Sequence, residues 1–441
     1  MFQLKEHNTN VRTEILAGFT TFMTMAYILI VNPNILSAIG GEVTFNAVFV
    51  ATALAAFVGT TAMALLANYP FALAPGMGLN AFFAFTVVLA GRLTWQQALT
   101  AILIEGIIFI ILTFVNVREA LFNAIPMTLK YAVSAGIGLF IAFIGFQNAG
   151  IVVANDATLV AITEDITQAP VVLALLGVII TAVLVVKKVK GSILYGIIIT
   201  WVLAIVAEGI GWYVPDMENT FSVIPSAIAA PIETSGLLLF RFDFAALGNL
   251  DFWVIMLSFL FVDLFDTLGT LIGVSSKAGF LDKDGKLPKA KQALFADAIG
   301  TTFGAMIGTS TTTTYVESAA GVADGGRTGL TALTTAILFL LALPFAPLFA
   351  AIPSFATAPA LIIVGFYMME SVMKINFADP TKGIPAFLTV IVMPIMYSIS
   401  EGIAFGVISY TVVNAFSKNR KDVHPLMYVL TILFVLKFIF F

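Results

Sequence analysis

The chain has 441 residues, of which 60% are hydrophobic and 10% charged, against roughly 45–50% and 25% in a soluble globular domain. Its 21 basic and 25 acidic residues nearly cancel, so it has no basic domain for nucleic acid. The absence of cysteine excludes disulfides and cysteine-ligated metals. The two histidines, His7 and His424, lie outside the apolar runs, which excludes a buried histidine metal cluster. The composition therefore indicates a polytopic membrane protein in a lipid bilayer.

Apolar runs of about 16 to 24 residues match the roughly 20 residues that a helix needs to cross the bilayer. We expect fourteen membrane segments, at 15–38, 46–67, 70–90, 95–115, 127–149, 170–186, 191–209, 252–274, 290–308, 310–324, 328–349, 356–373, 384–398 and 401–416. A further apolar stretch, 425–441, either spans the membrane or lies against the bundle.

The basic residues predict the orientation. With a cytoplasmic N-terminus, eighteen of the 21 lie in inside loops, and the exceptions are Arg92, Arg241 and Lys437. An excess of Lys and Arg on the cytoplasmic side is the usual pattern of membrane proteins. We therefore expect a multi-pass protein of the cell membrane whose N-terminus is cytoplasmic.

The longest polar stretch, 210–250, is expected to be an extracytoplasmic connector that divides the chain into two halves, 15–209 and 252–416. The first segment starts near Leu16 and the eighth near Trp253, an offset of 237 residues that also carries Asn80 onto Glu317. Seven segments are an odd number, so two similar halves insert with opposite orientations. The sequence thus predicts an all-α, 7+7 inverted repeat, which is typical of secondary transporters.

The third segment begins with Pro70, Pro75, Gly76 and Gly78, so a continuous helix cannot run through it and helix is expected only from about Gly78. Taken alone, this break is equally consistent with a simple kink.

The tenth segment begins with four threonines, Thr311 to Thr314, whose branched side chains favour an extended backbone. A threonine run can also bond back onto its own helix. Because both halves are interrupted at similar places, we expect a short strand and a half-helix in each, starting near Asn80 and Glu317. Such paired interruptions point to a binding site at mid-membrane.

The eighth segment carries two acids, Asp263 and Asp266, and each costs roughly 2.5–3.5 kcal/mol to insert at a helix centre. Spaced three residues apart, they share a helical face with Thr267 and Thr270. Two carboxyl groups in an apolar site repel one another, so at least one is expected to hold a proton. The pattern favours proton coupling, and the alternative is that an Asp caps a half-helix or bonds threonine hydroxyls.

Glu317 is the third central acid, at the start of a half-helix where the helix dipole favours its charge. Its alternative role is a capping carboxylate. Glu317 suits a substrate with adjacent N–H donors, and Asn80, with donor and acceptor groups, suits the edge of a heterocycle. Four other acids are expected to be structural: Glu14, Glu105, Glu370 and Glu401.

Four stretches carry a recognisable family pattern. They are AGFTTFMTMAYILIVNP at 17–33, APGMGLNAFFAF at 74–85, FVDLFDTLGTLIGV at 261–274 and TSTTTTYVESAAGVADGGRTGLTA at 309–332. With these motifs in order, essentially the whole chain resembles the AzgA-like purine permeases. They are a branch of the nucleobase–cation symporters related to the uracil/proton symporter.

The resemblance implies proton-coupled uptake of adenine, guanine or hypoxanthine, with the proton as coupling ion and no cofactor or metal. It also implies a core domain, 15–115 plus 252–349, that moves like an elevator against a gate domain, 127–209 plus 356–416. The sequence leaves the preferred purine, the proton stoichiometry and the formation of a homodimer open.

By the same resemblance, Asn80, Asp263, Glu317 and Tyr315 contact the substrate, and Asp263, Asp266 and Glu317 take part in proton coupling. Supporting positions are Thr267, Gly78 and Ser318. The sequence departs from the uracil symporter where that relative has Glu and His four residues apart and this chain has Asp263 and Thr267. Uracil specificity is therefore not expected.

Two other classes remain open at this point. Paired membrane-embedded aspartates occur in intramembrane aspartyl proteases, where they share a proton, but those enzymes carry them on separate helices, one in a GxGD motif that this chain lacks. An anion exchanger or channel of the same fold would favour basic or neutral groups at the half-helix starts, and Glu317 argues against it. We therefore expect a transporter and not an enzyme.

Overall fold

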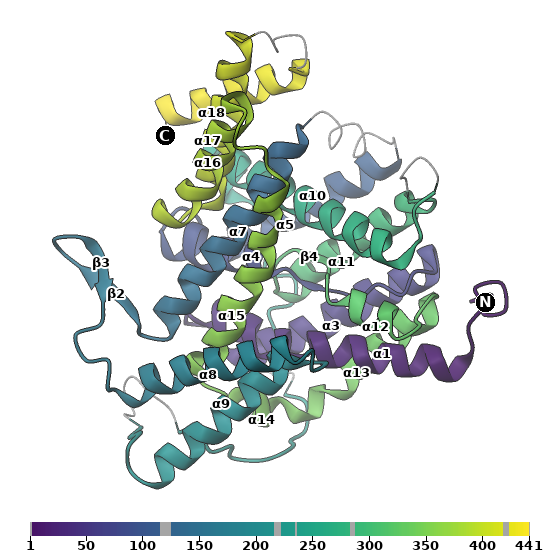
Figure 1. Ribbon diagram of the computed structural model, residues 1–441, viewed down its shortest axis with the longest axis vertical. Coiled ribbons are helices and arrows are strands. Elements are labelled where there is room, and N and C mark those ends of the chain that lie inside the picture. Colours follow the sequence, from purple (N-terminus) through teal and green to yellow (C-terminus); the bar gives the residue numbers. More distant parts are fainter. Residues whose placement is uncertain are drawn as a thin grey trace.

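The computed structural model describes residues 2–114, 125–215, 222–233, 236–282, 287–417 and 423–440 (Figure 1). Six of the basic residues used to predict the orientation lie outside these ranges: Arg118, Lys283, Lys286, Lys418, Arg420 and Lys421. The same holds for part of the 210–250 connector.

Helices make up most of the described chain. In the first half they are α1 (Val11–Met25), α2 (Ile28–Ser37), α3 (Phe45–Ala62), α4 (Met77–Ala81), α5 (Trp95–Phe114), α7 (Met127–Asn148), α8 (Ala169–Val186) and α9 (Ser192–Gly209). In the second half they are α10 (Leu250–Ala278), α11 (Ala290–Ile307), α12 (Ser318–Ala323), α13 (Gly329–Leu341), α14 (Ala346–Ala350), α15 (Ser354–Met369), α16 (Pro380–Ile395), α17 (Ile399–Ala415) and α18 (Pro425–Phe440).

Shorter helical turns extend or link these elements. Two are π-helices that continue α3 and α4, η1 (Met63–Ala67) and η2 (Phe82–Leu89). Three are 3₁₀ turns, η3 (Ala245–Gly248), η4 (Leu343–Phe345) and η5 (Glu370–Lys374). The strands are β1 (Leu73–Pro75), β2 (Val152–Asn155), β3 (Leu159–Ile162) and β4 (Thr312–Thr314), and β2 and β3 form a hairpin that projects from the bundle (Figure 1).

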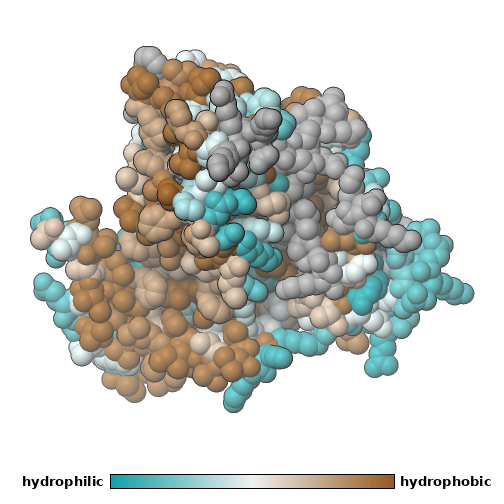
Figure 2. Space-filling view, turned by 45° about the horizontal axis from the view of Figure 1, so that its top comes forward, coloured by the Kyte–Doolittle hydropathy of each residue, from teal (hydrophilic) through white to brown (hydrophobic). Residues whose placement is uncertain are grey.

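The outer surface has the character of a membrane protein. Within the described residues, eight helical stretches are long and apolar enough to cross a bilayer. Large apolar side chains point outward from them, as at Ile179 and Val186 on α8 and Val206 on α9. A broad hydrophobic face is visible in Figure 2. Because such a face is unfavourable in water, it is suited to contact lipid.

The two halves cross at a pair of glycines, Gly59 on α3 and Gly300 on α11. A Cβ atom on Gly59 would lie 3.3 Å from the Cα of Gly300, and one on Gly300 would lie 3.2 Å from the Cα of Gly59. The next residue of each helix is a threonine that holds a strand. Thr60 Oγ1 accepts from the Leu73 N–H at 2.8 Å, and Thr301 Oγ1 accepts from the Thr312 N–H at 3.3 Å. Each half therefore has a glycine at the helix crossing followed by a threonine whose hydroxyl bonds a strand.

The strands that the threonines hold pair with each other. β1 and β4 are antiparallel, with Ala74 opposite Thr313 at the centre of the pair. Each strand leads into a short helix, α4 from Met77 and α12 from Ser318. The predicted interruptions of the third and tenth segments are therefore present, and the extended threonine run is confirmed.

One detail of the predicted repeat is wrong. The helix starts at Met77 and Ser318 are 241 residues apart, so Glu317, which precedes α12, is equivalent to Gly76, which precedes α4. Asn80 lies within α4, one turn beyond that position. The offset of 237 that placed Asn80 on Glu317 came from segment starts read from the sequence, whereas the strands β1 and β4 start 239 residues apart. The second half also has two more residues than the first between its strand and its short helix.

A second group of helices packs beside this crossed unit. α7 packs against α15 and α16, and α16 packs against α17. α7 and α15 approach so closely at Gly138 and Gly365 that a Cβ on Gly365 would lie 2.4 Å from the Gly138 carbonyl oxygen. The C-terminal stretch forms α18, which packs on α17 through Phe405 and Phe438 at the upper end of Figure 1.

Candidate functional site

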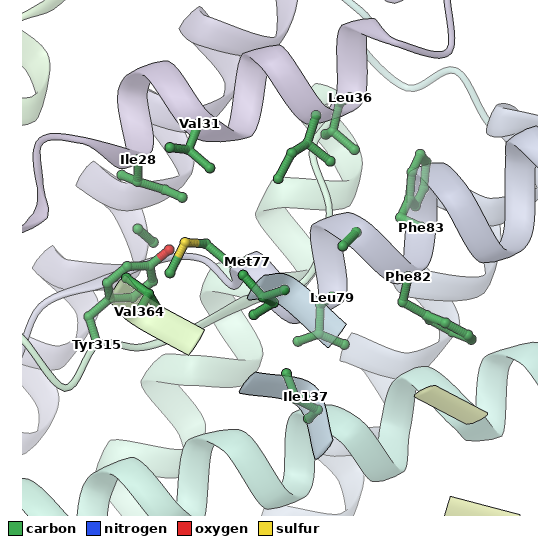
Figure 3. Close-up of a cluster of buried hydrophobic side chains, with 14 of the residues drawn as sticks. Ile28, Val31, Leu36, Met77, Leu79, Phe82, Phe83, Ile137, Tyr315 and Val364 are labelled. Atoms are coloured by element: carbon green, nitrogen blue, oxygen red, sulfur yellow. The ribbon is translucent and has the colours of Figure 1, made fainter. Parts of the chain in front are cut away.

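The candidate site lies where β1 and β4 lead into their helices, near the middle of the molecule (Figure 1). Tyr315 follows β4, and its O–H donates to the Pro75 carbonyl at 2.6 Å, which joins the ends of the two strands. Figure 3 shows Tyr315 in a cluster of apolar side chains from five helices: Ile28, Val31, Leu36, Met77, Leu79, Phe82, Phe83, Ile137 and Val364. The strand ends thus meet in a mostly apolar environment.

Glu317 occupies the N-cap position of α12 but makes no side-chain cap bond there. Its Oε1 instead accepts a hydrogen bond of 2.6 Å from the hydroxyl of Tyr27, a fully buried residue between α1 and α2. Glu317 itself is only partly buried. The alternative role as a helix cap is therefore not what its contacts show.

Tyr27 was not among the residues singled out from the sequence. A signal existed, because Tyr27 lies in the motif 17–33 and is its only polar aromatic residue.

Asn80 is completely buried in α4. Its Oδ1 accepts a hydrogen bond from Ser310 Oγ, and its Nδ2 lies 3.4 Å from the Pro75 carbonyl oxygen. In this conformation both ends of the amide are therefore engaged by the protein.

Asp263 on α10 is also completely buried and forms a bridged pair with Asp297 on α11. Thr267 Oγ1 lies 2.9 Å from Asp263 Oδ1 and 2.8 Å from Asp297 Oδ1. Asp297 was not among the residues singled out from the sequence. The signal was available, since it is the one acid in the apolar segment 290–308.

Asp266, one helical turn from Asp263, is partly buried and contacts β4. Its Oδ2 accepts from Thr313 Oγ1 of β4 at 3.1 Å. It lies close enough to Asp297 and Glu317 to interact with both electrostatically.

The two small supporting residues shape the backbone. Ser318 Oγ accepts from the Ala72 N–H at 3.0 Å and so fixes the start of α12 against the chain before β1. A Cβ on Gly78 would lie 2.7 Å from Ile137 Cγ2, so glycine allows α4 to approach α7.

One segment, 310–317, connects most of the predicted site residues. Ser310 bonds Asn80, Thr313 bonds Asp266, and Glu317 bonds Tyr27. A further threonine of this segment, Thr311, donates to Glu105 of α5 at 3.0 Å. The structure therefore brings Asn80, Asp266, Tyr315 and Glu317 around β4, with Asp263 one turn along α10. In the described part of the chain, no group of His, Asp and Glu is arranged to hold a metal ion.

The arrangement can bind a flat, polar-edged molecule and can hold protons. Carboxylate and amide oxygens accept hydrogen bonds from N–H groups, Asn80 can also donate, and the surrounding apolar side chains offer contact area.

The fold is that of the 7+7 inverted-repeat membrane transporters. The transmembrane domain of the cyanobacterial bicarbonate transporter BicA has the same fold with a TM-score of 0.65 at 14% sequence identity, over 90% of this chain and 97% of that one. The predicted fold class is thereby confirmed, and with it a multi-pass membrane protein.

Sequence comparison gives the family: the chain belongs to the Permease family, whose model matches residues 12–405. It is 44% identical to adenine permease AdeP of Escherichia coli over 100% of this chain and 95% of that protein. It is 45% identical to guanine/hypoxanthine permease PbuO of Bacillus subtilis over 99% of each chain. The resemblance to the AzgA-like purine permeases is confirmed. Permeases are transporters, so the chain is not an enzyme and the protease alternative is wrong.

Proposed function

We propose that the protein imports purine nucleobases, namely adenine, guanine or hypoxanthine, by proton symport. The observation that carries the substrate class is the identity of 44% and 45% to adenine and guanine/hypoxanthine permeases over nearly the whole chain. The site supports it, because purines have adjacent N–H donors along a flat edge and the groups around β4 are mainly hydrogen-bond acceptors.

We assign substrate contact to Asn80, Asp263, Tyr315 and Glu317. Glu317 and Asp263 accept from purine N–H groups, Asn80 bonds the ring edge, and Tyr315 with its apolar neighbours covers the ring face. The hydrogen bonds that Asn80 and Glu317 make within the protein are then exchanged for bonds to the substrate. Exchange of this kind keeps buried polar groups satisfied before and after binding.

Proton coupling is supported by the bridge between Asp263 and Asp297. Thr267 has one hydroxyl hydrogen, so it donates to one carboxylate at a time. Its oxygen lies 2.9 Å and 2.8 Å from the two acids, and both contacts are favourable only if one of the carboxyl groups holds a proton and donates it to Thr267. This adds Asp297 to the predicted proton-coupling residues Asp263, Asp266 and Glu317, with the proton as coupling ion.

We further propose that the core, 15–115 plus 252–349, moves against the gate, 127–209 plus 356–416, in a cell membrane with the N-terminus on the cytoplasmic side. The separate packing of α7, α15, α16 and α17 supports this division. Motion of a rigid core carries a site built on β1 and β4 without breaking the strand pair.

Counterflow in proteoliposomes tests the substrate class. Labelled adenine, guanine, hypoxanthine, uracil and sulfate are supplied in turn to vesicles loaded with the same unlabelled compound. We expect exchange with at least one purine and none with uracil or sulfate. Exchange of sulfate without purine exchange would replace the proposal with an anion exchanger of this fold.

Ion gradients test the coupling. We expect an inward proton gradient to drive purine accumulation, and a sodium gradient at collapsed pH difference and membrane potential to drive none. Full accumulation with sodium alone would contradict proton symport.

A further inference from the structure

Tyr27 is not among the residues to which we assign substrate contact, but it bonds one of them, Glu317. It lies in the interruption between α1 and α2, with none of its surface exposed. A phenol hydroxyl in such surroundings needs a hydrogen-bond partner, because burial without one is costly. Its partner is Glu317 Oε1, at 2.6 Å and 290 residues away in the chain.

A hydrogen bond from a hydroxyl to a carboxylate is one of the stronger kinds of protein hydrogen bond when the carboxylate is ionised. A second contact from α1, between Thr24 Oγ1 and the Glu317 carbonyl oxygen at 3.5 Å, places the same helix against the same residue. Glu317 is partly accessible, whereas Tyr27 is not. Tyr27 thus bonds the carboxylate from its protein side.

We propose that Tyr27 is a positioning residue that makes Glu317 selective for substrates with an N–H group facing it. By occupying Oε1 from one side, the Tyr27 hydroxyl fixes the plane of the carboxylate, so that its remaining lone pairs have a set direction. A substrate N–H along that direction makes a well-aligned hydrogen bond to Glu317. An N-methyl group in the same place clashes with the carboxylate, which cannot rotate to relieve the clash.

This role rests on the proposed purine transport, in which Glu317 accepts a hydrogen bond from the substrate. Tyr27 orients the Glu317 carboxylate for that bond. A freely rotating carboxylate would lose part of the preference for N–H over N–CH₃, because misaligned hydrogen bonds weaken steeply. Removing only the phenol oxygen therefore lowers selectivity more than it lowers transport capacity.

The test compares purified wild type with Tyr27→Phe, which keeps the ring and removes the hydroxyl. The affinity for hypoxanthine and for its 1-, 7- and 9-methyl derivatives is measured by competition against one labelled purine. We expect wild type to reject at least one methyl derivative strongly. Tyr27→Phe should bind hypoxanthine about tenfold more weakly than wild type does. The ratio of its affinities for hypoxanthine and the rejected methyl derivative should fall about tenfold. Its maximal rate of counterflow should stay within about twofold of wild type.

Tyr69→Phe is the matched control. Tyr69 is a buried tyrosine outside the site, whose hydroxyl accepts from the Lys289 N–H at 3.2 Å. It should keep the wild-type selectivity. Because all ligands compete on one sample, a smaller folded fraction leaves the affinity ratios unchanged. If Tyr27→Phe is not recovered folded, Tyr27→Met gives the same comparison with an apolar side chain.

An unchanged methyl-derivative ratio in a Tyr27→Phe protein that binds hypoxanthine would overturn the role of Tyr27. An equal loss of maximal counterflow for every substrate, with ratios intact, would also overturn it and indicate a structural residue. Failure of the proposed function looks different, because the wild-type protein then binds none of the purines.

Discussion

The buried and half-buried acids of the site share one type of partner, a hydroxyl group. Tyr27 bonds Glu317, Thr313 bonds Asp266, and Thr267 lies between Asp263 and Asp297. A hydroxyl can donate to an ionised carboxylate and accept from a protonated one. Acids with such partners can change protonation state without leaving a buried group unsatisfied, which suits a site that picks up and releases protons.

Glu317→Gln should abolish purine binding and leave the protein folded. The carboxamide keeps the size but offers one acceptor oxygen instead of two, and its NH₂ group faces the N–H donors of the substrate. Binding of labelled hypoxanthine to detergent-purified protein measures the effect. Glu370→Gln, an exposed change of the same kind, is the control and should bind as wild type does. Normal hypoxanthine affinity in Glu317→Gln would remove Glu317 from the site.

Thr267→Val should reduce proton-driven purine accumulation by about tenfold or more, because it removes the hydroxyl between Asp263 and Asp297 at nearly constant volume. Thr267→Ser keeps a hydroxyl and should stay within about threefold of wild type. Accumulation under an inward proton gradient is the measurement, with counterflow at equal pH as the reference. Equal accumulation by the two variants would show that the hydroxyl is not required.

At the scale of helices and strands, close backbone approach at glycine decides how the elements fit. α3 and α11 cross at Gly59 and Gly300, and α7 and α15 meet at Gly138 and Gly365. In lipid the hydrophobic effect between helices is weak, so association depends on close packing, which small residues allow. These contacts determine where the strands and half-helices lie, and thereby the geometry of the site.

Gly365→Ala should destabilise the protein by about 1–3 kcal/mol. The new methyl group would lie too close to the Gly138 carbonyl oxygen and would push α7 and α15 apart. The shift in thermal unfolding midpoint in detergent measures it. Gly209→Ala, at the end of α9, places its Cβ in open space and is the matched control. If both variants unfold at the wild-type temperature, the α7–α15 contact does not limit stability.

Sequence reasoning predicted the broken helices, but it did not single out Tyr27 and Asp297. Pro75 and the threonines before Tyr315 have strong local effects on the backbone, so the interruptions could be predicted from the local sequence. Tyr27 and Asp297 could not be connected to the site in this way. Glu317 is 290 residues from Tyr27, and the two meet only because the two halves of the chain pack together. Thr267 is 30 residues from Asp297, on a different helix of the same half, so their contact depends on how α10 and α11 lie in the fold.

At the scale of the whole molecule, a contact joins the proposed core to the proposed gate. Lys190, between α8 and α9, pairs with Asp324 at the end of α12. Thr20 of α1 also donates to Asp324, at 2.6 Å. An exposed ion pair of this kind contributes about 0–1 kcal/mol. It is therefore weak enough to break in each transport cycle.

Because the chain has no native cysteine, this contact can be tested by cross-linking. Cysteines at positions 190 and 324, joined by a short bis-methanethiosulfonate that forms a disulfide with each thiol, should block counterflow, and a reductant, which cleaves both disulfides, should restore it. The control pair replaces Arg92 and Asp251, an ion pair that joins the first part of the core to the first turn of α10 and does not involve the gate. Cross-linking this pair should leave transport unaffected. Full transport by the 190–324 cross-linked protein would contradict movement of core against gate.

The strand pair of β1 with β4 also bears on how the protein is made. Each strand comes from a different half of the chain, and their backbone groups bond each other deep in the bundle. A half produced alone would leave these groups without partners at a depth where lipid offers none. Neither half can therefore form a site, and two co-expressed fragments divided within 210–250 should regain transport only by assembling with each other. During synthesis, β1 therefore has no strand to pair with until the second half, which contains β4, has been inserted.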